Sequence, residues 1–294
     1  MTTPQPEAPI GVFDSGVGGL SVLRSIREEM PEESVHYVAD QAHVPYGPRS
    51  LEQVRAFSEG ITRFLIGRGA KIIVVACNSA SAAALTHLRT QFPDIPFVGM
   101  EPAVKPAAEK TQTGVVGVLA TPATFQGALF ASVVERFAAG VTLLQDTCPG
   151  LVERIEAGDL DGTETRAILR SALAPMLARR IDTVVLACTH YPFVIPLIQE
   201  IAGSGVRVID PAPAVARQAR RRLEANGRRR AAGGPGNVEY FTSGNPTQLA
   251  DNLTRLLQVE GQAAGLVWLS DDSLVEQALP ATGAAESARR AGQG

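Results

Sequence analysis

The sequence predicts an α/β protein with two pseudo-symmetric lobes, each a mostly parallel sheet flanked by helices, and an active site in the cleft between them. Apolar runs of strand length alternate with stretches of helical periodicity along the 294 residues. Two of these runs, 72–76 and 183–187, are each followed by a cysteine and two polar residues. The first apolar runs of the two halves also resemble each other: one is Ile10-Gly-Val-Phe and the other is Val116-Gly-Val-Leu.

The first half is expected to alternate strands and helices and to close its third strand with a cysteine. Strands buried on both faces read as short apolar runs, and amphipathic helices repeat apolar residues every three or four positions. A glycine-rich turn at 15–19 follows the first strand, and the loop 41–48 contains Pro-Tyr-Gly-Pro. The expected elements are 10–14, 20–30, 35–39, 51–64, 72–76, a helix ending at 88 and a strand near 97.

The second half repeats this order with elements at 114–119, 125–137, 141–144, 164–178 and 183–187. The repetition indicates an internal duplication; the alternative is one long doubly wound sheet. The remaining segments are a strand at 206–210, a helix at 211–226, a solvated Arg- and Gly-rich linker at 227–236, a strand at 238–241 and a helix at 246–257, with flexible tails at 1–8 and 270–294.

Composition excludes several classes of partner. Hydrophobic residues make up 45% of the chain and charged residues 19%, which predicts a sizeable core. The net charge of -3 and the pI of about 5.9 argue against nucleic acid or a membrane surface as the main partner. No apolar run reaches the roughly 18 residues of a membrane span. The first residues do not resemble a signal peptide, so a cytoplasmic location is expected.

The three cysteines are expected to be free thiols. They include no CxxC pair, and no cluster of His and carboxylate residues has the spacing of metal ligands. Neither a dinucleotide-binding nor a phosphate-binding glycine motif is present. The sequence therefore predicts a site without metal or cofactor. Cys148 precedes a proline in a loop without an apolar approach and is not a candidate.

Polar residues at the strand ends are the candidates for the site, because ligands of open α/β sheets bind outside the carboxyl ends of the strands. This set is rich in neutral hydrogen-bonding groups and contains no Lys or Arg. Helix N-termini next to it would suit a small anion. The candidates are Asp14, Ser15, Tyr46, Gly47, Cys77, Asn78, Ser79, Thr121, Cys188, Thr189 and His190.

Each of the two strand-end thiols has a possible acid–base partner. Asp14 ends the first strand of the half that contains Cys77, and His190 lies two residues after Cys188. Matched bases on two sides of one ligand suit racemisation or epimerisation at a carbon acid. A single buried strand-end cysteine is more often an inert core residue, and the repeated pattern favours the catalytic interpretation.

Five segments together resemble the signature segments of glutamate racemases. They are Asp14-Ser-Gly-Val-Gly-Gly19, Pro45-Tyr-Gly47, Ala76-Cys-Asn78, Cys188-Thr-His-Tyr-Pro192 and Tyr240-Phe-Thr-Ser-Gly-Asn-Pro246. The resemblance covers roughly residues 9–268 in the same order. It implies a cofactor-independent enzyme that interconverts L- and D-glutamate and supplies D-glutamate to peptidoglycan, in a homodimer. It also implies one lobe of residues 9–98 and 212–268 and a second lobe of residues 99–211.

Carried over by motif, Cys77 and Cys188 are the acid–base catalysts, and Asp14 and His190 assist them. The resemblance implies that Glu156 contacts His190. It also implies that Asp14, Ser15, Tyr46, Gly47, Asn78, Ser79, Thr121, Thr189 and His190 bind substrate. Two positions depart from the family pattern: Ser79 replaces the usual Thr, and Ala187 the usual Gly.

Three other functions remain possible from the sequence alone. An aspartate racemase would share both thiols and differ in pocket depth. A Cys-His hydrolase would act through a thioester and leave the second thiol without a role. A pair of binding lobes without catalysis is disfavoured by reactive thiols in the cleft.

Overall fold

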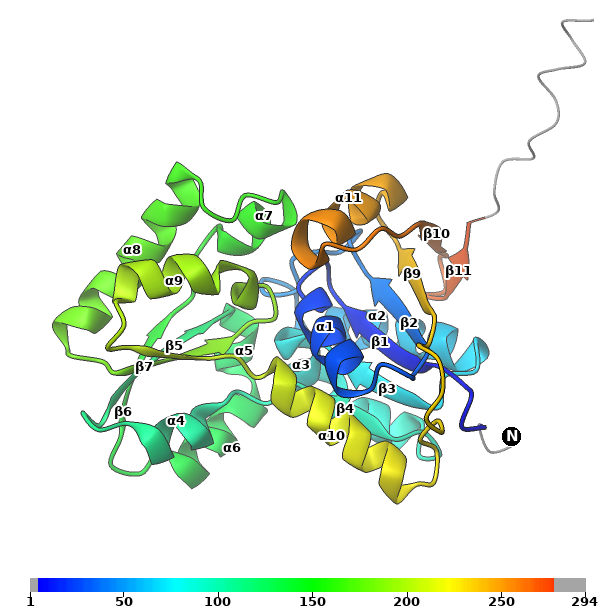
Figure 1. Ribbon diagram of the computed structural model, residues 1–294, viewed down its shortest axis with the longest axis horizontal. Coiled ribbons are helices and arrows are strands. Elements are labelled where there is room, and N and C mark those ends of the chain that lie inside the picture. The colour runs from blue at the N-terminus through cyan, green and yellow to red at the C-terminus, as the bar shows by residue number, and fades with distance from the viewer. Residues whose placement is uncertain (1–4, 278–294) are drawn as a thin grey trace, which may run out of the picture.

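The computed structural model describes residues 5–277, and its strands form two separate sheets (Figure 1). The strands of the first sheet are β1 (Ile10–Asp14), β2 (Val35–Ala39), β3 (Ile72–Val75), β4 (Phe97–Gly99), β9 (Val238–Thr242), β10 (Ala263–Trp268) and β11 (Leu274–Glu276). The strands of the second sheet are β5 (Val115–Ala120), β6 (Thr142–Asp146), β7 (Thr183–Ala187) and β8 (Arg207–Ile209).

The two sheets share one strand order. The first runs β11-β10-β9-β2-β1-β3-β4 and the second β6-β5-β7-β8, so β2-β1-β3-β4 corresponds to the whole second sheet. Neighbouring strands pair in parallel except β10 and β11, which pair antiparallel. The expected pair of pseudo-symmetric α/β lobes is confirmed, and the single doubly wound sheet is excluded.

Helices cover both faces of each sheet (Figure 1). Those around the first sheet are α1 (Leu20–Glu29), α2 (Leu51–Gly67), α3 (Asn78–Gln91), α10 (Ala212–Ala225) and α11 (Pro246–Leu257). Those around the second are α4 (Val104–Lys110), α5 (Pro122–Gln126), α6 (Ala128–Phe137), α7 (Leu151–Glu156), α8 (Thr163–Ala178), the 3-10 turn η1 (Tyr191–Val194) and α9 (Ile195–Ala202). No helix of residues 5–277 has the length and apolar character needed to cross a membrane.

Burial explains why the central strands read as unbroken apolar runs. Every residue of β1, β3 and β7 is buried, because helices pack on both faces of these strands. One apolar cluster joins the two lobes. It contains Val17 and Leu20 from the first lobe and Ile155 and Tyr191 from the second. The strand ends of the two lobes therefore meet over a shared core.

Several elements differ from the expectation. The helix expected at 125–137 is two helices, α5 and α6, separated at Gly127. A Cβ at Gly127 would lie 2.7 Å from the Cβ of Ala82 on α3, so the break allows a close approach between the lobes. The short helices α7 and α9 were not predicted, because their apolar segments are too short to show a helical period.

The expected tails and linker are partly built into the first lobe. Residues 274–276 form β11 rather than a tail, and Leu274 is buried against the neighbouring elements; residues 278–294 and 1–4 lie outside the described residues. The linker 227–236 is not simply solvated. Arg228 donates to the Lys71 carbonyl, and the Arg230 N–H donates to Glu33. Lys71 and Glu33 form a fully buried ion pair, which requires such additional hydrogen bonds.

Candidate active site

The carboxyl ends of β1, β3, β5 and β7 face one another and enclose a small pocket. Its volume is about 20 Å³, room for about one water molecule and far too little for an amino acid substrate. The cleft is therefore closed and has to open for a ligand to enter. The lining residues are Ser15, Pro45, Tyr46, Gly47, Cys77, Asn78, Ser79, Thr121, Val152, Cys188, Thr189 and His190.

Cys77 reaches the pocket from the first lobe, at the junction of β3 and α3. It is the N-cap of α3, and its Sγ accepts a hydrogen bond from the Ala80 N–H at 3.4 Å. The Cys77 Sγ also lies 3.9 Å from the Ser15 Oγ, in position to donate. Burial raises the pKa of the Cys77 thiol well above its ordinary value, and the charge of Asp14 raises it further. Cys77 is thus a thiol in the closed site.

Cys188 reaches the pocket from the second lobe, directly after β7, and its partner is His190. The Cys188 Sγ lies 3.8 Å from the His190 Nδ1, and the His190 Nε2 lies 2.6 Å from the Glu156 Oε1. Burial alone would lower the pKa of His190, but the interactions with Cys188 and Glu156 outweigh it and raise that pKa well above its ordinary value. His190 is therefore an imidazolium beside Cys188.

Glu156 lies behind the pocket and is held as a carboxylate. Burial would raise its pKa, but hydrogen bonds and charge from His190, with the Val17 N–H and Gln41, lower the pKa overall. The Val17 N–H donates to Oε1 at 2.7 Å, and the Gln41 Nε2 donates to Oε2 at 3.2 Å. The contact between Glu156 and His190 implied by the resemblance is present.

Asp14 also lies behind the pocket, where it shapes the glycine-rich turn. Its Oδ2 accepts the Gly19 N–H at 2.8 Å and the Gly16 N–H at 3.3 Å. Burial raises the pKa of Asp14, opposed by the His190 charge and the Gly19 hydrogen bond. A Cβ on Gly18 would overlap the His190 ring, so this turn packs directly on the imidazole of the other lobe.

The remaining polar residues line the pocket without all being paired. Both side-chain atoms of Asn78 are buried and have no hydrogen-bond partner within residues 5–277. The Ser79 Oγ lies 2.9 Å from the Thr121 Oγ1 of the other lobe. Ser79, which departs from the Thr of the family pattern, thus keeps a hydroxyl that bridges the cleft. The Tyr46 OH donates to the Asp40 Oδ2 at 2.6 Å. Orphaned amide groups in a pocket indicate a place for a polar ligand.

Comparison with known proteins gives one consistent result. Residues 10–219 match the model of the Asp/Glu/Hydantoin racemase family. The curated glutamate racemase of Stutzerimonas stutzeri is 52% identical over 243 residues, covering 83% of this chain and 91% of that protein. The chain belongs to the glutamate racemase family.

Solved structures agree with this assignment. A glutamate racemase isoform of Bacillus anthracis superposes with a TM-score of 0.78 at 31% identity, covering 89% of this chain and 98% of that chain. The Escherichia coli glutamate racemase, solved with L-glutamate and the activator UDP-MurNAc-ala, gives a TM-score of 0.74 at 33% identity, covering 85% of this chain and 94% of that chain. As a member of this family, the chain is an isomerase.

The structure of this glutamate racemase family member brings ten of the predicted site residues to one pocket. Asp14 and Glu156 stand behind it, and Pro45 and Val152 line it without having been predicted. Asp40 and Gln41, which support the site residues, were not predicted. Asp40 accepts the hydrogen bond of the Tyr46 OH, and the Gln41 amide donates to the Glu156 carboxylate. Their position at the end of a predicted strand was the signal that could have found them. Within residues 5–277, no group of three or more His, Cys, Asp or Glu is arranged to hold a metal.

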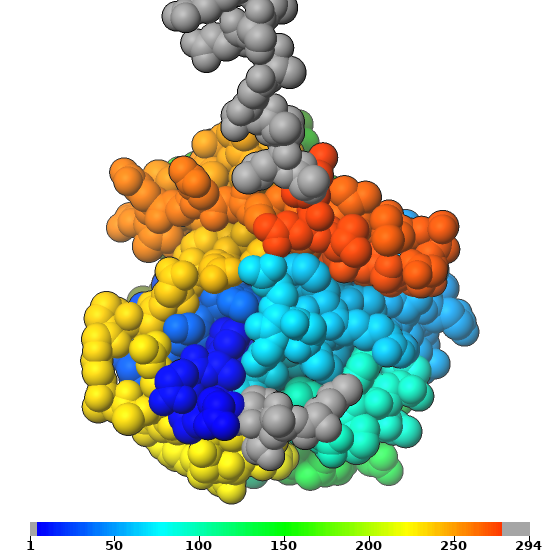
Figure 2. Space-filling model, turned by 90° about the vertical axis from the view of Figure 1, so that its right-hand side faces the viewer, coloured from blue at the N-terminus to red at the C-terminus, as the bar shows by residue number. Residues whose placement is uncertain are grey.

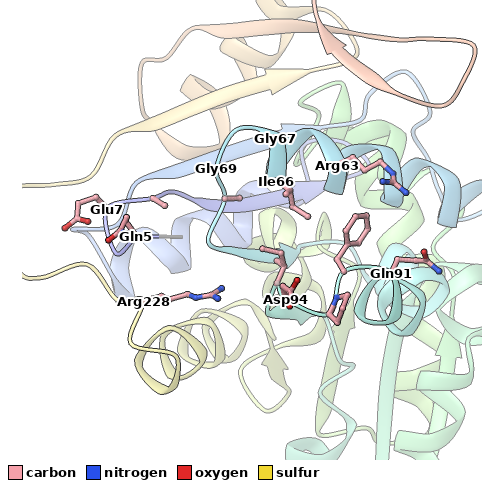
Figure 3. Close-up of a pocket in the computed structure, with 14 residues that line it drawn as sticks. Gln5, Glu7, Arg63, Ile66, Gly67, Gly69, Gln91, Asp94 and Arg228 are labelled. Carbon is pink, nitrogen blue, oxygen red and sulfur yellow. The ribbon is translucent and has the colours of Figure 1, made fainter. Parts of the chain in front are cut away.

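A larger groove lies elsewhere and contains none of the predicted residues. It has a volume of about 1210 Å³ and lies where Glu7, Gly69 and Asp94 precede β1, β3 and β4 (Figure 3). The thiols follow the opposite, carboxyl ends of the strands. On this face, the residues before β1 lie between the turn after α2 and the segment after α10 (Figure 2). Its lining has no cysteine or histidine, so it does not compete as the catalytic site.

Proposed function

We propose that this chain interconverts L- and D-glutamate in the closed pocket, with Cys77 and Cys188 as the two acid–base groups. One observation supports this above the others. The two thiols line one small pocket from opposite lobes, each with its own polar partner. A hydrolase that acts through one nucleophile would leave the second thiol without a role.

The proposed reaction moves one proton on each face of the substrate. With L-glutamate, the Cys188 thiolate takes the α-proton and becomes a thiol. The electron pair left on the α-carbon then takes the proton of the Cys77 thiol, which gives D-glutamate and a Cys77 thiolate. The reverse sequence converts D-glutamate, and a proton exchange between the thiols and solvent resets the site.

The polar groups receive roles from their positions. His190, oriented by Glu156, stabilises the thiolate form of Cys188, and Asp14 is the proton partner of Cys77. Asn78 offers its unpaired amide to the substrate. The other proposed substrate ligands are Asp14, Ser15, Tyr46, Gly47, Ser79, Thr121, Thr189 and His190. The L-glutamate in the Escherichia coli relative supports glutamate as the substrate. D-glutamate for peptidoglycan is the product that the family supplies.

We also propose the wider organisation that the resemblance implies. The lobes are residues 9–98 with 212–268 and residues 99–211; the passages of the chain between the sheets, after β4 and after β8, support this division. The active form is a homodimer. A cytoplasmic location is supported by three free thiols, which are typical of a reducing compartment.

The deciding test uses L-glutamate in D2O with EDTA present and no pyridoxal phosphate. We expect the optical rotation to fall to zero while deuterium enters the α-carbon, because no step of the proposed reaction uses a metal or cofactor. L-aspartate under the same conditions is the matched control and should keep its rotation. Unchanged L-glutamate, or activity that returns only with pyridoxal phosphate, would refute the proposal.

The activity is expected to show a bell-shaped pH profile. Turnover needs one cysteine as a thiolate, so it falls toward acid pH, where no thiolate remains and where Glu156 is neutralised. Alkali removes the imidazolium proton of His190 and the thiol proton that Cys77 has to donate, so turnover falls again. The raised pKa of the Cys77 thiol and of the His190 imidazolium moves this second limb toward higher pH. The measurement is the initial rate between about pH 6 and about pH 10, the range around an ordinary cysteine pKa. A constant rate over this range would contradict the bell-shaped profile.

A further inference from the structure

We propose that Arg255 and Asn252 of α11 are positioning residues that clasp the end of α7 and so set how far the cleft is closed. The clasp consists of Glu156, Ala157 and Gly158 from the second lobe with Val17, Gln41, Asn252 and Arg255 from the first. This inference concerns the opening of the pocket, and only its consequence for turnover rests on the proposed function.

The contacts of the clasp come from three places in the first lobe. The Arg255 guanidinium donates to the Ala157 carbonyl at 3.0 Å, and the Asn252 Nδ2 donates to the Glu156 carbonyl at 3.3 Å. The Val17 N–H and Gln41 hold the Glu156 carboxylate. The first lobe therefore binds both the backbone carbonyl and the side-chain carboxylate of Glu156. Glu156 also contacts His190.

Gly158 fits this arrangement closely. Its φ is +76°, in the region that favours glycine, and a Cβ there would overlap the Arg255 guanidinium. The carbonyls at the end of α7 lack partners within their own helix, and α11 supplies donors for them. The chain thus has a glycine where the guanidinium needs room to reach the helix end.

The clasp lies where opening of the cleft would have to separate the two lobes. The chain passes between the lobes after β4 and again between β8 and α10, and α7 and α11 meet on the other side of the interface (Figure 1). A hinge at these two passages would separate α7 from α11. Because the closed pocket has a volume of only about 20 Å³, every substrate has to be admitted by such an opening.

The three cysteines offer a direct measure of this opening. Cys77 and Cys188 line the pocket and are each 4% exposed, whereas Cys148 is 2% exposed in the apolar core outside it. Opening of the cleft exposes the first two thiols, and unfolding exposes all three. Alkylation by iodoacetamide, measured for each cysteine by peptide mass spectrometry, therefore separates the two events.

Arg255→Ala is the main variant, because Arg255 is exposed and its loss does not disturb the core. We expect Cys77 and Cys188 to be alkylated about threefold to tenfold faster, the effect of one lost hydrogen bond, with Cys148 unchanged. Gly158→Ala places a methyl group where the Arg255 guanidinium lies and should therefore also speed the alkylation of Cys77 and Cys188. Arg255→Lys should restore most of the protection, and Arg221→Ala, an exposed arginine of α10 outside the clasp, should change nothing.

Two results would overturn the clasp. One is alkylation of Cys77 and Cys188 at the native rate in both Arg255→Ala and Gly158→Ala. The other is a proportional rise for Cys148, which would mean local unfolding. These readouts need no turnover, so a chain that fails to racemise glutamate but shows the expected labelling would refute the proposed function and leave the clasp standing. In an active enzyme, kcat/KM for glutamate should fall in Arg255→Ala and recover in Arg255→Lys.

Discussion

Replacing either Cys77 or Cys188 with serine is expected to abolish racemisation, with a loss of at least about a thousandfold in kcat/KM. An alcohol is far too weak an acid to be ionised near neutral pH, so each variant lacks one of the two proton-transfer groups. Because both faces of the α-carbon are needed, either loss alone stops the conversion. The measurement is circular dichroism of glutamate with each purified variant, at equal folded concentration.

The same two variants are expected to remain active on one enantiomer each of a suitable analogue. In a glutamate analogue with a leaving group on the β-carbon, the electron pair freed by loss of the α-proton expels that group, so the second proton transfer is unnecessary. Cys188→Ser should still process the D form through Cys77, and Cys77→Ser should still process the L form through Cys188. Release of the leaving group reports the reaction.

The third cysteine supplies the control for this experiment. Cys148 is buried outside the pocket, so Cys148→Ser should keep racemisation and process both enantiomers of the analogue. The assignment of one thiol to each face is wrong if both pocket variants lose both enantiomers equally while they remain folded. A mechanism with a single nucleophile would then explain the site better.

Strand ends were the part of the site that the sequence could predict. A buried parallel strand has a clear apolar pattern, and its carboxyl end has a known place in the fold, so the residue pattern alone could place Cys77 and Cys188 at facing strand ends. The repeated order of elements likewise predicted two matching sheets, because a duplication repeats its pattern. These are local signals, readable within about ten residues.

Contacts across the lobes could not be predicted in this way. Gln41 reaches Glu156 over 115 positions of sequence, and the Ser21 hydroxyl reaches the Thr189 carbonyl over 168. The strand end before Gln41 marks that residue as a candidate, but no local pattern in the sequence identifies the partner of either residue in the other lobe. Leu274 was assigned to a tail for a related reason, since a three-residue edge strand gives no periodic signal and depends on β10 for its partner.

His190 and Asp14 are each expected to act mainly on one enantiomer of the analogue. His190→Asn is expected to slow elimination from the L analogue by about a hundredfold or more and to affect the D analogue much less. His190 contacts Cys188 and not Cys77, so the thiolate that loses its cation is the one facing L substrates. Asp14→Asn should show the opposite preference through Cys77. Some loss on the D side is expected in His190→Asn, because the His190 charge also lowers the pKa of Asp14.

Elimination is the necessary readout, because racemisation cannot show a preference. The enantiomers of glutamate have equal free energy in water, so kcat/KM for the two directions has to stay equal in every variant. Glu156→Gln keeps the shape of the carboxylate and removes its charge, which lowers the pKa of His190. On the L analogue, the alkaline limb of the pH profile should therefore move to lower pH, while the pH profile on the D analogue should not move. Equal losses for both enantiomers in His190→Asn, or an unmoved limb in Glu156→Gln, would show that the histidine does not act through Cys188.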